Sequence, residues 1–388
     1  MSKLDLSSNS LFHKFQWIEE EDIAEVSELL RNGELSGFLA TKSPSHLGGP
    51  QVQLLEKLWA QLSRTQGAVT FNSWTSGLEA SIASLGLKPG LEVIVTPWTM
   101  VATVSAITNS NLIPVFCDID SNSYNIDPNQ VEKLLSPNTG AILAVDIFGK
   151  PCAFESLGEL AKNAGVPLII DAAQTPLATT GGYRSSEFAD ISGYSFNRHK
   201  HLQCGEGGIA VSNDPIYIKR MQCYRNHAEV TTESEDLLVS GHNFRLGEIE
   251  SKLIIKQLAR IEKLVMHRRK AAVAIIQGLS DLQSVSLPEP SLVEHDYYIL
   301  GMNLQPKIAN KREDIYHKLK DLGTPGILFG YDNIQRYSAF SKFRRARLPV
   351  AESLQDEKFL GLYMCGIEWT PLAIETVIAN FRRVLLNL

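Results

Sequence analysis

Short apolar runs alternate with helix-like segments along residues 68–170, and this alternation limits the possible folds more than any other feature. The runs are apolar at consecutive positions, whereas the segments between them carry apolar residues at helical spacing. Strands that are apolar on both faces are typical of a mostly parallel sheet covered by helices on both sides. The pattern predicts an α/β fold with strands at 68–71, 92–96, 112–117, 141–145 and 167–170, and helices at 75–85, 100–108, 128–135 and 154–163.

The chain of 388 residues is longer than one small hydrophobic core supports, which predicts two domains. We predict a large domain at residues 1–269, including an N-terminal helical and loop segment, and a smaller α+β domain at residues 270–388. The elements outside the alternation are predicted as helices at 19–30, 52–62, 214–225, 246–279, 311–322 and 374–386, a strand at 297–304, and a long loop at 36–50.

Composition limits the class of partner. A formal net charge of −6 argues against a nucleic-acid footprint or an anionic membrane surface, so a few placed groups would have to hold any anionic ligand. The five cysteines form no CxxC pair, which is typical of reduced thiols in the cytosol. The N-terminal residues have no apolar core of signal-peptide length, and no run approaches a membrane span, so we expect a cytoplasmic protein.

Ser73, Trp98 and Asp171 each follow one of the predicted strands. Ligands of parallel sheets bind at the carboxyl ends of strands, so these residues are expected to converge on one crevice. Ser73 and the next two residues, Trp74 and Thr75, precede a helix, where backbone N–H groups and a hydroxyl can hold a phosphate; alternatively, Thr75 only caps that helix. Trp98 offers a flat face for an aromatic ligand, although a tryptophan in the core is the alternative.

Lys200 lies in a polar stretch, residues 193–208, that ends in a glycine cluster. A desolvated lysine loses its proton readily and can form a Schiff base, whereas a solvated surface lysine is the alternative. Asp171 suits a pyridine-type cofactor, because an anion keeps the ring nitrogen protonated and the ring can then act as an electron sink. The alternative for Asp171 is an N-cap on a following helix.

Other polar features carry weaker signals. His199 and His201 flank Lys200, but no cysteine or carboxylate nearby completes a ligand pattern, so no metal is expected. The glycine-rich segment 205–208 lacks the spacing of a dinucleotide fingerprint and is interpreted as a turn. The basic run 342–347 is interpreted as a solvated face, with contact to a substrate phosphate as the alternative.

Together these motifs resemble, in order and spacing, those of the DegT/DnrJ/EryC1/StrS family of sugar aminotransferases, which use pyridoxal phosphate (PLP). The resemblance extends from about residue 20 to the end and is much stronger before residue 260. It implies a fold-type I PLP-dependent transferase with the two domains described above. The residues that carry it are Ser73 and Thr75; Pro97, Trp98 and Thr99; Asp171 and Gln174; Ser195, Phe196, Lys200 and the segment 205–208; and Gly241, Asn243 and Arg245.

The resemblance implies a role for each of these positions. Lys200 would bind the cofactor covalently and move protons as a general acid and base. Asp171 would pair with the pyridine nitrogen, Gln174 would contact the phenolic oxygen, and Trp98 would stack on the ring. The phosphate would be held by Ser195 and the segment Trp74–Thr75, and by Asn243 of the partner subunit, so the resemblance implies a homodimer with shared active sites.

The activity implied is transfer of an amino group from glutamate or glutamine to a keto sugar, in particular a nucleotide-linked keto-deoxyhexose, in surface-polysaccharide or natural-product biosynthesis. A dehydratase of the same family and a non-catalytic regulator that binds PLP or a sugar nucleotide are alternatives. The dehydratase branch has histidine in place of Lys200, so the lysine favours transamination. Two departures stand out: Trp74 replaces the usual glycine, and the C-terminal substrate motif is poorly matched at 326–333.

Overall fold

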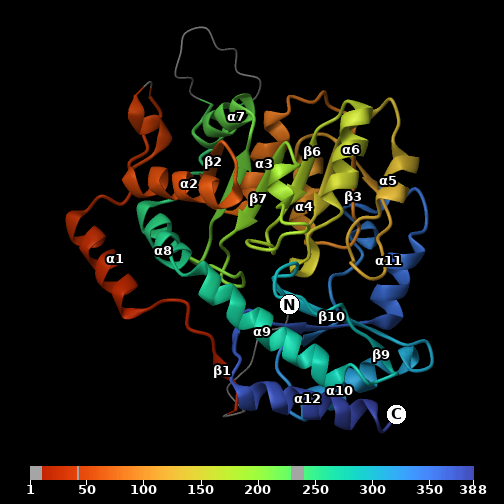
Figure 1. Ribbon diagram of the computed structural model, residues 1–388. Coiled ribbons are helices and arrows are strands. Elements are labelled where there is room, and N and C mark those ends of the chain that lie inside the picture. Colours follow the sequence, from red (N-terminus) through yellow and green to blue (C-terminus); the bar gives the residue numbers. More distant parts are fainter. Residues whose placement is uncertain (1–10, 42, 229–239) are drawn as a thin grey trace.

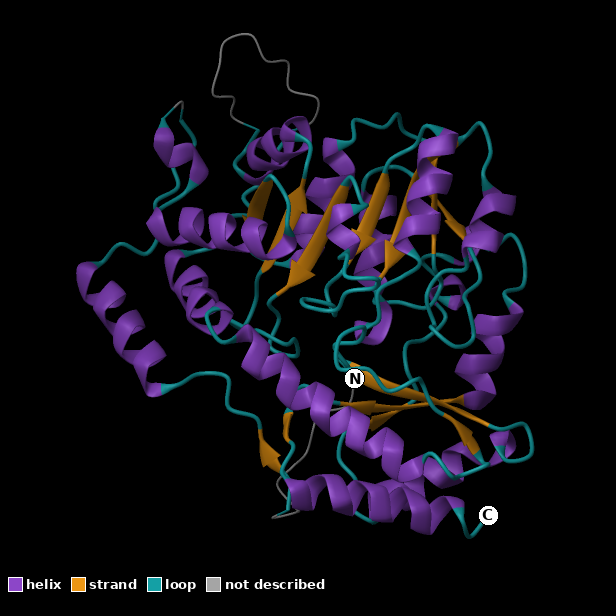
Figure 2. Ribbon diagram, viewed as in Figure 1, coloured by secondary structure: helices purple, strands orange, loops and turns teal. Residues whose placement is uncertain are grey.

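The computed structural model describes residues 11–41, 43–228 and 240–388. Its largest sheet has seven strands within these residues, and Figure 2 shows them between two groups of helices. The strands are β2 (Gly67–Phe71), β3 (Glu92–Val95), β4 (Ile113–Phe116), β5 (Thr139–Val145), β6 (Leu168–Asp171), β7 (Ile191–Ser195) and β8 (Gly208–Ser212).

The strand order is β2-β8-β7-β6-β5-β3-β4, and among the described strands of this sheet only β8 runs against its neighbours. The predicted mostly parallel sheet is therefore confirmed. Each of the five predicted strands is present, with ends that differ by one or two residues. Strands β7 and β8 are absent from the sequence prediction.

Helices bury both faces of this sheet. Alternate strand residues face opposite sides: Val93 and Val95 pack with α3, α4 and α7, whereas Ile94 packs with α2, α5, α6 and α8. This explains why the strand sequences are apolar without alternation. The helices of this layer are α2 (Pro50–Ser63), α3 (Trp74–Ser84), α4 (Val101–Asn109), α5 (Pro128–Leu134), α6 (Phe154–Ala164), α7 (Pro215–Arg225) and α8 (Glu248–Leu258).

A second, antiparallel sheet has the order β11-β12-β10-β9 within the described residues and packs with the C-terminal helices (Figure 1). Near it, β1 (His13–Lys14) pairs with β13 (Ile367–Glu368). The domain boundary at 269/270 stays a prediction. The remaining elements are α1 (Glu20–Asn32), α9 (Ile261–Leu279), β9 (Val285–Ser286), β10 (Ile299–Leu304), α10 (Arg312–Asp321), β11 (Ile327–Leu328), α11 (Pro349–Ser353), β12 (Phe359–Tyr363) and α12 (Pro371–Leu385).

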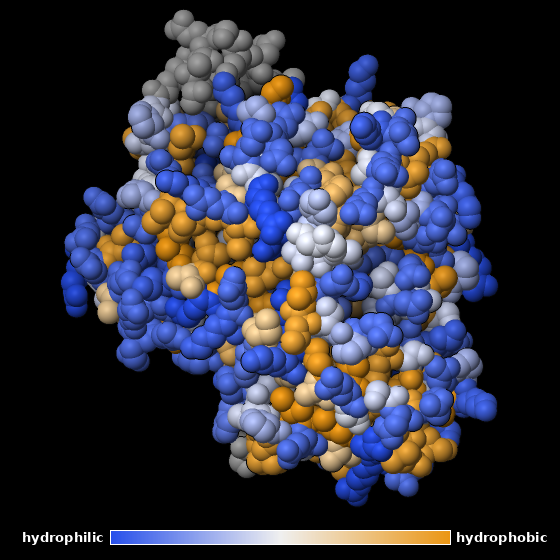
Figure 3. All heavy atoms as spheres, in the orientation of Figure 1, coloured by the Kyte–Doolittle hydropathy of each residue, from blue (hydrophilic) through white to orange (hydrophobic). Residues whose placement is uncertain are grey.

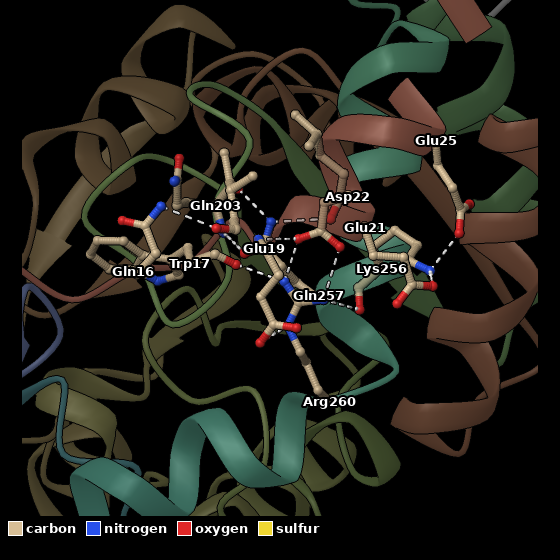
Figure 4. A network of polar contacts seen from close by, with 12 residues as sticks. Gln16, Trp17, Glu19, Glu21, Asp22, Glu25, Gln203, Lys256, Gln257 and Arg260 are labelled. Carbon is tan, nitrogen blue, oxygen red and sulfur yellow. Dashed lines mark hydrogen bonds and ion pairs between the residues drawn. The ribbon is translucent and has the colours of Figure 1, made fainter. Parts of the chain in front are cut away.

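The helix predicted across 246–279 is wrong in one respect, because the chain forms two helices, α8 and α9. The backbone at Arg260 leaves helical values, with ψ of 17°. The Arg260 guanidinium donates to Asp22 of α1 at 3.0 Å and to the carbonyl of Trp17 at 2.8 Å (Figure 4). These contacts fasten α1 to the junction between α8 and α9.

The N-terminal residues in which no signal sequence was predicted include residues 1–10, which lie outside the described part of the chain. Within the described part, no helix combines the length and the apolar character needed to span a lipid bilayer.

Candidate active site

A cavity of about 520 Å³ opens at the carboxyl ends of β6 and β7, beside the start of α3. This is the position expected for a ligand of a parallel sheet. The structure brings together most of the predicted site residues there: Trp74, Thr75, Asp171, Gln174, Ser195 and Lys200.

The start of α3 forms one wall of the cavity. Ser73 is the N-cap, because its hydroxyl accepts from the Ser76 N–H at 3.1 Å. The alternative that Thr75 caps the helix is therefore wrong, and Thr75 lines the cavity instead. Gly208 of β8 lies close to the first turn of α3. A Cβ at this position would be 2.5 Å from the backbone nitrogen of Trp74, so the close approach of strand and helix requires glycine.

Asp171 ends β6, and its carboxylate is buried. Oδ1 accepts from Trp74 Nε1 at 2.8 Å and from the Ala173 N–H at 3.2 Å, and Oδ2 accepts from the Thr103 hydroxyl at 3.0 Å. Burial raises the pKa of Asp171, and these hydrogen bonds and the charge of Lys200 oppose that rise. No helix follows directly in the described chain, so the N-cap alternative is wrong.

Gln174 is held at both ends of its amide. Its Oε1 accepts from the Phe148 N–H at 2.7 Å, and its Nε2 donates to the hydroxyl of Tyr331 at 3.0 Å. Tyr331 comes from the loop after β11 and also lines the cavity. The amide therefore connects the large sheet to the C-terminal part of the chain.

Lys200 extends into the cavity as a half-buried side chain. Its Nζ lies 4.5 Å from the centroid of the Tyr298 ring. Burial lowers the pKa of Lys200 to about 8, although the charge of Asp171 acts in the opposite direction. A substantial part of the amine is consequently neutral near physiological pH, as a nucleophile requires.

The loop that follows Lys200 is fastened by side chains from distant segments. Trp17 Nε1 donates to the carbonyl of His201 at 3.2 Å. Gln257 of α8 accepts from the Gln203 N–H at 2.9 Å and donates to the Gln203 carbonyl at 2.8 Å (Figure 4). The position of Lys200 therefore depends on α8 and on the N-terminal segment.

The two histidines beside Lys200 have structural partners. The ring of His201 is buried, with Nε2 2.9 Å from the Asp296 carbonyl, and burial lowers its pKa well below the usual value. The carbonyl of His199 accepts from the Tyr363 hydroxyl at 2.7 Å. Among the residues with described positions, no group of three or more His, Cys, Asp or Glu is placed to hold a metal ion.

Trp98 lies in the core and is not among the residues that line the cavity. It packs edge-on against Tyr124, Phe148 and Phe359, at centroid distances of 5.7, 5.4 and 4.9 Å. Its indole N–H donates to the carbonyl of Tyr331. This position does not support the stacking role, which stays a prediction.

Asn243 and the basic run do not line the cavity. Asn243 is exposed and forms an isolated bridge with Asn226. In the basic run, Arg345 pairs with Glu92, and Arg347 pairs with Glu352, both at 2.7 Å. The run is therefore a surface face with acidic partners in its own chain.

Thr103, Tyr298 and Tyr331 are among the cavity residues that the sequence did not predict as part of the site. The tyrosines belong to the C-terminal part of the chain, where the motifs are weakest, and no local pattern links them to Lys200. Thr103 lies near the start of α4, one helical turn after Thr99. Because α4 also contains Ser105, Thr108 and Asn109, the sequence does not single out Thr103.

The residues fit PLP. A carboxylate has about four lone-pair positions, and Trp74, Ala173 and Thr103 occupy three, so Oδ2 of Asp171 can accept from one more donor. The N–H groups in the first turn of a helix have no intrahelical acceptor and suit a phosphate. Thr75 and Ser195 would hold that phosphate, Asp171 the ring nitrogen and Lys200 the aldehyde carbon. When bound, PLP supplies an electron sink.

Comparisons with known proteins find similar chains among the aminotransferases. GDP-perosamine synthase from Escherichia coli O157:H7 is 28% identical over 79% of this chain and 83% of that protein. The dTDP-3-amino-3,4,6-trideoxy-alpha-D-glucose transaminase from Streptomyces venezuelae is 32% identical over 63% of this chain and 65% of that protein. An aminotransferase structure from Psychrobacter cryohalolentis superposes with a TM-score of 0.87 at 25% identity, covering 97% and 99% of the two chains.

A family match covers most of the chain. The sequence model of the DegT/DnrJ/EryC1/StrS aminotransferase family matches residues 17–377, which includes every residue of the cavity named above. The chain therefore belongs to the DegT/DnrJ/EryC1/StrS aminotransferase family and is a PLP-dependent aminotransferase.

Proposed function

We propose that the chain transfers an amino group from glutamate or glutamine to the carbonyl carbon of a nucleotide-linked keto-deoxyhexose, in the synthesis of a surface polysaccharide or natural product. Support for the substrate class comes from the names of two relatives, a GDP-perosamine synthase and a dTDP-amino-sugar transaminase. Both names describe amino sugars attached to a nucleoside diphosphate.

The observation that carries the proposal is the placement of Lys200 in the same cavity as Asp171 and Gln174. Amino transfer requires an amine that can attack a carbonyl and afterwards move protons at the reacting carbon. The lowered pKa of Lys200 supports both tasks, because its neutral and charged forms coexist near pH 8. A protein that only binds a sugar nucleotide has no need of such a lysine.

We also propose a homodimer in which Asn243 of the partner subunit completes the phosphate site. Asn243 is exposed and does not line the cavity of its own chain, so its side chain is available to a partner subunit. Figure 3 shows hydrophobic side chains gathered over the surface where Figure 1 places α2 and α8. Leu54 of α2 is 41% exposed, which supports this surface as the region of contact. A cytoplasmic location stays a prediction.

The proposal is tested by the absorption spectrum of the protein with PLP. We expect a visible band from the lysine-bound cofactor that is absent in Lys200→Ala and that fades when glutamate or glutamine is added. A band that persists with both donors would favour the non-catalytic regulator. A sugar product that has lost water without gaining nitrogen would favour the dehydratase.

A further inference from the structure

The indole of Trp74 lies against the carboxylate that is expected to hold the cofactor ring. Trp74 is 5% exposed, and its Nε1 donates to Oδ1 of Asp171 at 2.8 Å. A glycine usually occupies this position in the motif that the sequence resembles, and glycine has no side chain to make such a bond. The hydrogen bond is therefore a property of this chain's own sequence.

Two glycines make room for the indole. A Cβ at Gly193 of β7 would lie 1.8 Å from Trp74 Cη2, and a Cβ at Gly77 would lie 2.6 Å from Trp74 Cε3. Real side-chain atoms do not approach so closely, so neither position tolerates even an alanine while the indole is in place. Gly193 also pairs directly with Asp171 in the sheet, which brings the indole and the carboxylate onto the same strand pair.

The carboxylate is held from both sides by neutral donors. Trp74 donates to Oδ1, whereas Thr103 donates to Oδ2, and the Thr103 hydroxyl is itself 3.2 Å from the hydroxyl of Thr99. Hydrogen bonds to an anion favour its charged form, and a neutral donor does so without adding a positive charge that would compete with a protonated pyridine. Two fixed donors also fix the direction of the remaining lone pair on Oδ2.

We propose that Trp74 is a positioning residue, whose indole N–H keeps Asp171 ionised and aimed at the ring nitrogen of PLP. The inference deepens the proposed function, because it concerns the cofactor site of the same enzyme. It does not depend on the identity of the sugar.

The test compares variants by PLP binding to the apoprotein, measured by equilibrium dialysis across pH. Trp74→Phe keeps most of the ring and removes the donor. Trp59→Phe is the matched control, because Trp59 is also buried and its indole N–H has no hydrogen-bond partner among the described residues. Gly193→Ala is a second variant, since its methyl group would push the indole away from Asp171 without removing any polar group.

We expect Trp74→Phe to bind PLP about tenfold more weakly at neutral pH, as for a lost hydrogen bond to a charged group. Without the donor the pKa of Asp171 rises further, so Asp171 takes up its proton at a higher pH on acidification. The acidic fall in PLP affinity should therefore move by about one pH unit to higher pH. Gly193→Ala should shift it in the same direction, and Trp59→Phe should leave it in place.

A purely structural role for Trp74 would lower stability without moving this pH midpoint, and an unmoved midpoint in Trp74→Phe or in Gly193→Ala overturns the proposal. Tighter PLP binding by Trp74→Phe also overturns it, since the indole would then compete with the cofactor. Failure to aminate a sugar would contradict the proposed function and leave these binding measurements unaffected.

Discussion

Lys200 is expected to react as a neutral amine at a lower pH than an ordinary lysine, because burial lowers its pKa from 10.5 to about 8. At pH 7 about one tenth of such an amine is neutral, roughly three-hundredfold more than for an exposed lysine. The anionic Asp171 favours the ammonium form and partly offsets the effect of burial. Asp171→Asn should therefore lower the pKa of Lys200 further.

Competitive labelling of the apoprotein with acetic anhydride measures this directly, with the Lys200 peptide quantified by mass spectrometry. The exposed Lys307, which lies outside α2 and α8, is an internal reference for reagent decay. We expect labelling of Lys200 to rise with pH and level off with a midpoint near pH 8, and at a lower pH in Asp171→Asn. Labelling that rises without inflection to about pH 10 would refute the argument, because Lys200 would then behave as a solvated lysine.

Three substitutions test other parts of the account. Trp98→Phe removes the N–H that donates to the Tyr331 carbonyl but keeps an aromatic ring. The free energy of unfolding in urea should therefore fall by about 1–2 kcal/mol, with little change in PLP affinity. Weaker PLP binding at unchanged stability would instead support the stacking role of Trp98. Arg225→Met leaves the buried Glu56 carboxylate, 2.5 Å from Arg225, without its charge partner. The substitution should lower the free energy of unfolding by about 3–5 kcal/mol. A decrease of less than about 1 kcal/mol would contradict a buried ion pair. Tyr331→Phe removes the hydroxyl that accepts from the Gln174 amide. The free energy of unfolding should fall by about 1 kcal/mol. An unchanged value in urea denaturation would mean that the amide finds another partner.

Five strands of the large sheet, β2 to β6, were predictable because each is buried on both faces and is therefore a continuous apolar run. Strand β7 was missed because Ser192, Gly193 and Ser195 interrupt its apolar run. Gly193 faces the Trp74 indole, and Ser195 lines the cavity. The break at Arg260 was missed, and the side chain there contacts Asp22, far away in the chain. Local pattern contains no information about such contacts.

The candidate site was partly predictable, because some of its residues belong to local sequence motifs. Lys200, Asp171 and Gln174 lie within motifs whose spacing follows the strand ends. Trp74 and Trp98 both follow a strand, and the motif pattern assigned the stacking face to Trp98. The structure places Trp74 at the cavity instead, because Gly193 on a distant strand leaves space for its indole. The contact between Gly193 and Trp74 joins residues far apart in the sequence, so only the three-dimensional structure shows it.

The central claim is that Lys200 catalyses amino transfer to a nucleotide-linked keto sugar. The most direct test incubates the protein with PLP, ¹⁵N-labelled glutamate or amide-labelled glutamine, and a panel of nucleotide-linked keto-deoxyhexoses, and measures the sugar product by mass spectrometry. We predict a product in which ¹⁵N has replaced the carbonyl oxygen, formed by the wild-type protein and not by Lys200→Ala. Labelled product from Lys200→Ala, or none from the wild type with any member of the panel, would contradict the claim.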